Sequence, residues 1–164
     1  MAEKVDTRFR RLESHEVVLA WDMLFAAIKK SELYSDDTSI LNMLMDAVGG
    51  RYQCWIFLDG DGMKGVVMTQ IFSVLNRRKL MVVHANSFEG GIGDDGWGLI
   101  WRKLLQFGQG EHCNEFEVFT ENPRVKAILR GLEFDEKAMF RKEITPCQQA
   151  AAQARSEEHT SELQ

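Results

Sequence analysis

The chain has 164 residues, of which 45% are hydrophobic and 27% charged, and this composition is typical of a single globular domain. A formal net charge of −5 disfavours non-specific binding to nucleic acid, and no apolar run approaches the roughly 18 residues that a membrane span requires. The first residues form no apolar leader, and three widely spaced cysteines fit reduced thiols, so we expect a cytoplasmic protein without disulfides. No pair of His or Cys residues is repeated at metal-ligand spacing, so we expect no metal.

Two helices are predicted after a short strand at residues 7–12. The first has Ser14 as its N-cap, and an apolar face repeats along it at helical spacing: Val17, Trp21, Leu24 and Ile28. The second opens at the polar residues 36–38 and ends at Gly49. Its predicted inward face consists of Leu41, Leu44, Met45 and Val48.

Three strands are predicted next, at residues 52–58, 65–74 and 79–84. The sequence of residues 59–62, Asp-Gly-Asp-Gly, favours a tight hairpin between the first two, because Asp-Gly tolerates positive φ. A second turn is expected at residues 76–78.

The second half of the chain alternates helices and strands. A helix after residue 93 is expected to bury five side chains: Trp97, Ile100, Trp101, Leu104 and Leu105. A strand follows at residues 115–119. Asn122 and Pro123 then begin a helix that turns four apolar side chains inward: Val125, Ile128, Leu129 and Leu132. A last strand is expected at 138–144.

This element order predicts an α/β (α+β) domain over residues 7–144. Strands grouped in hairpins, with one strand–helix–strand crossover, give a mixed, mostly antiparallel sheet with helices on both faces. Residues 145–154 are expected to form a flexible tail. The final ten, 155–164, resemble the translation of a sequencing-adapter oligonucleotide, and we interpret them as artefactual.

The most informative stretch is residues 83–93, which runs from a strand into a glycine-rich loop and a helix. Backbone N–H groups at such a helix N-terminus can hold an anion such as a pyrophosphate. The stretch resembles the coenzyme A loop of the GCN5-related N-acetyltransferases (GNAT), V-H-P-x-Y-R-G-x-G-I-G. The matching residues are Val83, His84, Gly91, Ile92 and Gly93. Phe88 stands where the family has arginine, and Glu89 where it has the following glycine.

A second segment resembles the family motif N-x-R-A-x-x-x-Y-x-x-x-G-F. Asn122, Arg124 and Phe134 fall in register with it. Leu129 occupies the position of the tyrosine that often protonates the leaving thiolate in that family, and Glu133 that of the glycine. We therefore expect Gly131 to take over the left-handed turn that ends the helix.

The resemblance implies a GNAT-like fold and direct transfer of an acetyl group from acetyl-CoA to an amine. It places the cofactor against Val83, Gly90, Gly91, Ile92, Gly93 and Asn122, in a gap between the strands at 79–84 and 115–119. His84 and Glu117 are the candidate general bases, although His84 also fits an ordinary strand-end side chain and Glu117 a solvent-facing one. No proton donor for the thiolate is visible.

Other features favour a protein that has lost catalysis. Phe88 removes a cation from the loop, and Asp94 and Asp95 bring carboxylates to it, although acidic residues also stabilise helix N-termini. The alternative is therefore a GNAT-fold binding or phage assembly protein without a cofactor, since short members with eroded loops are similar to ones in viral genomes and suit a metagenomic source. The acceptor, a small-molecule or protein amine, stays open, as does a homodimer. The compartment would be the cytoplasm of a bacterium or of a phage-infected cell.

Overall fold

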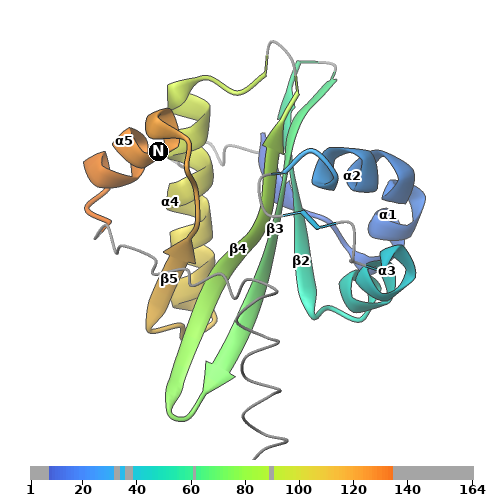
Figure 1. The fold of residues 1–164 in the computed structure, drawn as a ribbon, viewed down its shortest axis with the longest axis horizontal. Helices are drawn as coiled ribbons and strands as arrows, with labels where there is room; N and C mark the ends of the chain where they lie inside the picture. The colour runs from blue at the N-terminus through green and yellow to red at the C-terminus, as the bar shows by residue number, and fades with distance from the viewer. Residues whose placement is uncertain (1–7, 32–33, 36–38, 61, 89–90, 135–164) are drawn as a thin grey trace, which may run out of the picture. The chain divides into compact units, whose positions relative to one another are not determined.

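A five-stranded sheet in the order β1-β2-β3-β4-β5 divides the molecule into two helical layers (Figure 1). The computed structural model describes residues 8–31, 34–35, 39–60, 62–88 and 91–134. The strands are β1 (Phe9–Arg11), β2 (Tyr52–Asp59), β3 (Gly62–Val74), β4 (Arg77–Ser87) and β5 (Glu115–Val118). Neighbouring strands run antiparallel from β1 to β4, and β5 runs parallel to β4. The expected mixed, mostly antiparallel sheet with helices on both faces is confirmed.

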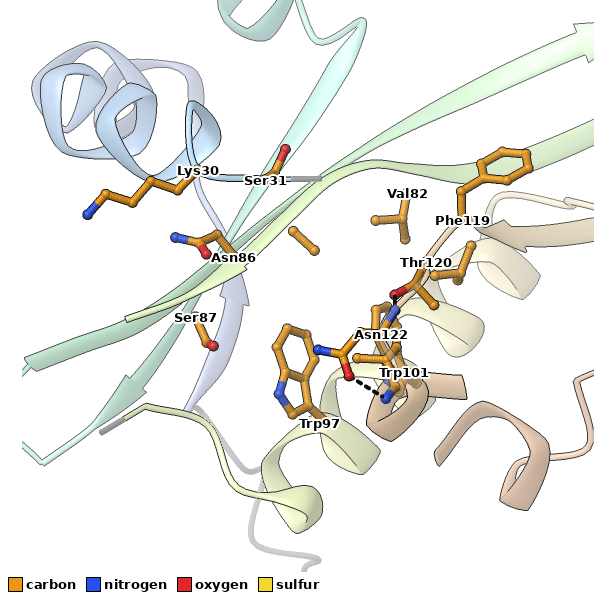
Figure 2. Close-up of a pocket in the computed structure, with 13 residues that line it drawn as sticks. Lys30, Ser31, Val82, Asn86, Ser87, Trp97, Trp101, Phe119, Thr120 and Asn122 are labelled. Atoms are coloured by element: carbon orange, nitrogen blue, oxygen red, sulfur yellow. Dashed lines mark hydrogen bonds between the residues drawn. The ribbon is translucent and has the colours of Figure 1, made fainter. Parts of the chain in front are cut away.

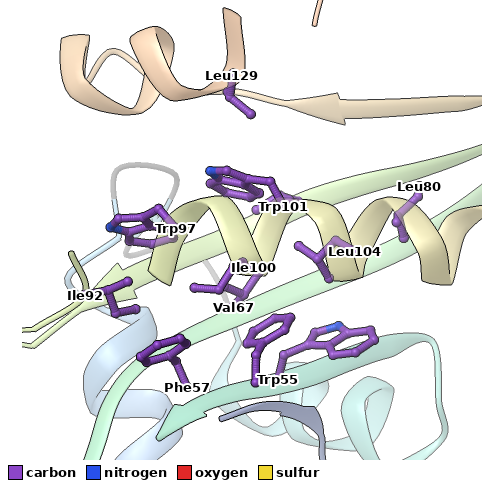
Figure 3. Close-up of a cluster of buried hydrophobic side chains, with 12 residues drawn as sticks. Trp55, Phe57, Val67, Leu80, Ile92, Trp97, Ile100, Trp101, Leu104 and Leu129 are labelled. Atoms are coloured by element: carbon purple, nitrogen blue, oxygen red, sulfur yellow. The ribbon is translucent and has the colours of Figure 1, made fainter. Parts of the chain in front are cut away.

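Side chains alternate between the two faces of the sheet and build a core on each. Trp55, Phe57 and Val67 pack under α4 (Asp94–Gly110) and α5 (Pro123–Gly131), as Figure 3 shows for α4. Cys54, Ile56 and Met68 face the opposite layer, formed by α1 (Ser14–Leu19), α2 (Trp21–Ile28) and α3 (Ile40–Val48). Because both faces are covered, β2 and β3 read as nearly continuous apolar runs.

The helix predicted from Ser14 is two helices, α1 and α2, broken at Ala20 (φ −99°, ψ 6°). The N-cap is Glu13, whose backbone N–H donates to the Glu16 carboxylate at 2.9 Å. Ser14 instead donates its hydroxyl hydrogen to the Val48 carbonyl and so ties α1 to α3. The predicted face is confirmed, because its four members are all buried: Val17, Trp21, Leu24 and Ile28.

The predicted inward face of α3 is wrong at two positions. Leu41 and Met45 are 66% and 63% exposed, whereas Met43 and Ala47 are buried. Asn42 and Asp46 give the segment Ile40–Val48 one polar side, and the face that packs is rotated from the predicted one toward Met43 and Ala47. The helix begins at Ile40 with Ser39 as its N-cap, and the start expected at 36–38 lies outside the described residues.

The helix after the glycine-rich loop is confirmed, but Leu105 is 39% exposed rather than buried. The stripe that packs on the sheet is Ile100, Trp101, Leu104 and Gly108, and Leu105 lies on its flank. Five strands and five helices are described, and the strand expected at 138–144 lies outside the described residues, as do the tails after it.

Both hairpins are tight. Asp59 pairs with Gly62, and Gly60 has a φ of +56°, as the Asp-Gly signal predicts. The second turn is shorter than expected, because Val74 pairs with Arg77 and leaves only Leu75 and Asn76 between the strands. β4 is longer than expected and continues through Ala85 and Asn86 to Ser87.

The last described helix begins as predicted, because the Asn122 side chain accepts hydrogen bonds from the backbone N–H groups of Arg124 and Val125. Its end differs from the prediction. Glu133 itself adopts the left-handed conformation, with a φ of +63°, and Gly131 closes the helix in an ordinary conformation.

Candidate functional site

The edge between β4 and β5 opens partway along its length. The two strands pair from Lys79 opposite Glu115 to Val82 opposite Val118, and there the pairing stops. β4 continues to Ser87, so the backbone groups beyond Val82 that point toward β5 have no strand to bind there.

A β-bulge in β4 lies at the same place. Met68 of β3 pairs with His84 and Thr69 with Val82, so Val83 is an additional residue in β4. The bulge changes which face the following side chains meet. Val82 and Ala85 pack with the α4 layer, whereas Val83 packs with the α1–α3 layer.

The opening contains a cavity of about 170 Å³ (Figure 2). Its walls come from both layers: the end of α2, the far part of β4, α4, and the segment from β5 into α5. The lining residues on which the argument depends are Ser31, Ala85, Asn86, Trp97, Trp101 and Asn122. The cavity is smaller than a usual pocket for a whole drug-sized ligand and suits a narrow arm.

Two polar groups in this lining bear on a ligand. Asn122 uses its side-chain oxygen to cap α5, so its NH₂ is the end that remains, and Figure 2 shows it on the side of Trp97. Trp101 is 1% exposed, and its indole N–H has no hydrogen-bond partner among the described residues. A buried donor without an acceptor is costly, so this part of the lining favours a ligand or water that accepts.

The glycine-rich loop is fixed on the core by Ile92. Its side chain is 6% exposed and lies against Gly65 and Gly96, where an added Cβ would come within 2.4 and 2.7 Å of it. A Cβ at Gly91 would meet the Phe88 carbonyl oxygen at 2.2 Å. Gly91 and Ile92 therefore have structural reasons for their identity within the loop.

Gly93 differs from Gly91. It is the N-cap of α4, and a Cβ built there meets nothing within 4 Å. Gly93 has no side chain with which to cap the N–H groups of the first turn of α4. Gly90 lies outside the described residues. The open side of Gly93 is where an anion can approach these donors.

The two acidic residues at this helix end, Asp94 and Asp95, have different surroundings. The Asp94 carboxylate accepts a hydrogen bond from the Arg124 guanidinium of α5, so its charge is partly neutralised. Asp95 is exposed. Phe88 donates its backbone N–H to the Lys64 carbonyl and packs with the α1–α3 layer. Arg124 therefore supplies a cation at this helix end, and Asp94 competes for it with any anion that binds there.

His84 lies beside the cavity rather than in its lining. Its Nδ1 is 2.7 Å from the Ser31 hydroxyl, and Ser31 does line the cavity. Burial lowers the pKa of His84 to about 4, so the imidazole is neutral at pH 7.

Glu117 lies on the paired part of β5, outside the cavity lining. Its carboxylate is 2.7 Å from Lys79 Nζ, and the bonded pair joins β4 to β5. The hydrogen bond to Glu117 is the largest cause of the raised pKa of Lys79.

Two of the predicted cofactor-binding residues are placed differently. Val83 lies at the bulge with its side chain away from α4, whereas Asn122 lines the cavity.

Sequence reasoning missed several lining residues. Asn86 and Ser87 fall inside the stretch that was singled out, but they were assigned to a loop. Lys30 and Ser31 follow α2 and carried no motif. Trp97 was expected to be buried; it is part of the core and also lines the cavity.

No helix described in the structure is long and apolar enough to cross a membrane. In the same part of the chain, no three His, Cys, Asp or Glu residues are grouped so that they could hold a metal ion.

No protein-family model matches the chain. No curated protein matches it either. Solved structures, in contrast, do match the chain. One described as a probable acetyltransferase has a TM-score of 0.63 at 15% identity, over 85% of this chain and 97% of the other. AAC(6')-Iy in complex with a CoA-containing bisubstrate analogue has a TM-score of 0.63 at 14% identity, over 82% and 96%. A predicted acetyltransferase from Clostridium acetobutylicum with acetyl-CoA has a TM-score of 0.59 at 9% identity, over 82% and 94%.

These likenesses concern the fold, because the identities are low. They cover nearly the whole of the other chains. The chain therefore has the fold of the GNAT acetyltransferases.

Proposed function

We propose that the protein is an N-acyltransferase that moves an acetyl group from acetyl-CoA directly to an amine. The observation that supports this most is the end of β4–β5 pairing at Val82 and Val118, with a cavity at that point. An extended arm with amide groups can bind an unpaired strand edge as a further strand would. Two of the acetyltransferases of this fold are solved with acetyl-CoA or a CoA analogue.

The residues present fit this acyl donor in two places. The backbone of Val83 to Ser87 and the NH₂ of Asn122 supply polar groups to an arm in the cavity. Gly93 leaves the N-terminal donors of α4 open to a pyrophosphate, with Arg124 nearby on α5. In this proposal Gly91 and Ile92 shape the turn.

His84 and Glu117 are the proposed bases, and the geometry favours His84. A base must reach the amine directly or through one bridging group. His84 meets this condition through Ser31, whereas Glu117 is bound to Lys79 away from the lining.

The alternative proposal is a binding or assembly protein on the same scaffold. It is favoured by Asp94, which occupies Arg124, and by the loss of a cation at Phe88. The two proposals differ in whether acetyl-CoA binds at all.

Thermal unfolding with and without 1 mM acetyl-CoA tests the proposal. A dissociation constant near 10 µM stabilises the folded state by about 2.7 kcal/mol, which raises the melting temperature by several degrees. Release of CoA thiol on adding primary amines then tests transfer. No shift at millimolar acetyl-CoA would contradict the enzyme and favour the binding protein.

A further inference from the structure

The hydroxyl of Ser31 stands between the cavity and the imidazole of His84. Ser31 is 9% exposed and is part of the lining, whereas His84 is not. The Ser31 Oγ to His84 Nδ1 distance of 2.7 Å is that of a good hydrogen bond. Figure 2 places Ser31 and Lys30 on one side of the cavity and Asn122 on the other. A group in the cavity therefore reaches His84 through Ser31.

We propose that Ser31 is a catalytic residue: its hydroxyl takes a proton from the acceptor amine and passes its own proton to Nδ1 of His84. The proposal rests on the proposed function, because it needs an amine in the cavity.

The bonds balance in this step. The amine nitrogen forms a bond to the acyl carbon, and the bond from that carbon to sulfur breaks with its electron pair on sulfur. The proton lost by nitrogen moves to Ser31 Oγ as the original Ser31 proton moves to His84. The sulfur takes a proton from water, and His84 later returns its proton to solvent.

Burial lowers the pKa of His84 to about 4, so the ring is neutral at pH 7 with a free lone pair. The imidazolium that the relay forms is correspondingly acidic and returns its proton readily to solvent. Two titratable side chains lie on this side among the described residues: Tyr34, whose ring centroid is 6.5 Å from that of His84, and Lys30 in the cavity lining. β3 places the uncharged Met68 opposite His84.

The tautomer of His84 is the first test, and it needs no ligand. The relay requires an unprotonated Nδ1 that accepts from Ser31, with the hydrogen on Nε2. ¹⁵N NMR of the full chain distinguishes the two tautomers, with His84→Gln used for assignment. An Nδ1 that carries the hydrogen overturns the relay whatever the activity.

Kinetics of the full chain with acetyl-CoA and a panel of primary amines, an alkyl diamine and a lysine peptide among them, is the second test. Ser31→Ala should lower kcat by about 100-fold or more and leave the acetyl-CoA dissociation constant unchanged, while Ser31→Thr, which keeps the hydroxyl, retains most of the rate. Wild-type activity with a Ser31→Ala rate within about threefold overturns the relay alone. An absence of transfer in the wild type, with no binding of acetyl-CoA, overturns the proposed function and the relay with it.

Discussion

Val82 and Val118 are the last residues paired between β4 and β5, and both line the cavity that begins there. The bulge at Val83 lies next to this pair and changes which layer the side chains beyond it meet. An irregularity in one strand thus coincides with the opening of the sheet. The candidate site therefore lies where the sheet opens.

Ala85 offers a way to close the cavity from within. It is partly buried and lines the cavity, so Ala85→Leu places a branched side chain where the arm of the acyl donor is proposed to lie. We expect the protein to fold and to lose the thermal shift with acetyl-CoA. Ala26→Leu on the exposed side of α2 is the matched control and should keep the shift. An unchanged shift in Ala85→Leu would place the ligand elsewhere.

Gly91 and Gly93 separate a structural glycine from a ligand-binding one. Gly91→Ala drives a Cβ against the Phe88 carbonyl oxygen and should destabilise the fold by about 2 kcal/mol, read by chemical denaturation. Gly93→Ala enters open space in an extended conformation and should cost only a few tenths of a kcal/mol. If the α4 N-terminus holds a pyrophosphate, Gly93→Ala weakens acetyl-CoA binding without unfolding the protein. Equal effects of the two variants on stability would contradict this assignment.

Asp94 is expected to weaken the binding of anions by occupying Arg124. Asp94→Asn frees the guanidinium and removes a negative charge beside the α4 N-terminus. We expect calorimetry to show acetyl-CoA bound several-fold more tightly, which corresponds to about 1 kcal/mol. Stability should change by less than about 1 kcal/mol, because both side chains are mostly exposed. Asp95→Asn lacks the arginine partner and serves as the control, and an equal gain there would show a general charge effect.

Among the described residues, the sequence predicted those elements well whose local pattern is compatible with one structure only. The face of α1 and α2, the Asp-Gly hairpin and the Asn122 cap each follow from local chemistry that tertiary contacts reinforce. The predicted face of α3 was wrong because α3 packs on α1 and β2, and these contacts select Met43 over Leu41.

The site was only partly predictable. The stretch at 83–93 pointed to the edge of the sheet where the cavity lies, because glycines and a strand end leave a local signature. Ser31 left none, since its position beside His84 depends on how α2 packs on β4, far away in sequence. The Asp94–Arg124 contact joins two helices in the same way. Contacts between elements that lie far apart in the chain cannot be predicted from one sequence alone.

Glu133 is expected to be a site of stored strain. A residue with a side chain at a φ of +63° is disfavoured, so Glu133→Gly should raise the free energy of unfolding by up to about 1 kcal/mol in urea denaturation. Gly131→Ala should also stabilise, by roughly 0.5–1 kcal/mol, because this glycine is helical and its Cβ position is open. Destabilisation by Gly131→Ala would indicate that Gly131, not Glu133, forms the left-handed turn.

His84 should make stability depend on pH in a defined window. Its pKa is about 4 in the folded protein and near 6.5 when unfolded, so the unfolded state binds the additional proton between these values. Its contribution is full above pH 6.5 and is lost as the pH falls toward 4. The loss is at most roughly 3 kcal/mol and should be smaller, because the ring keeps some contact with solvent. His84→Gln should flatten the pH dependence in this window, as measured by urea denaturation at several pH values. Glu16 serves as the internal comparison. Its pKa is lowered to about 2, chiefly by its hydrogen bond from Arg10, so its contribution to stability is lost only below pH 4.5. A slope between pH 4 and 6.5 that persists in His84→Gln would assign it to another group.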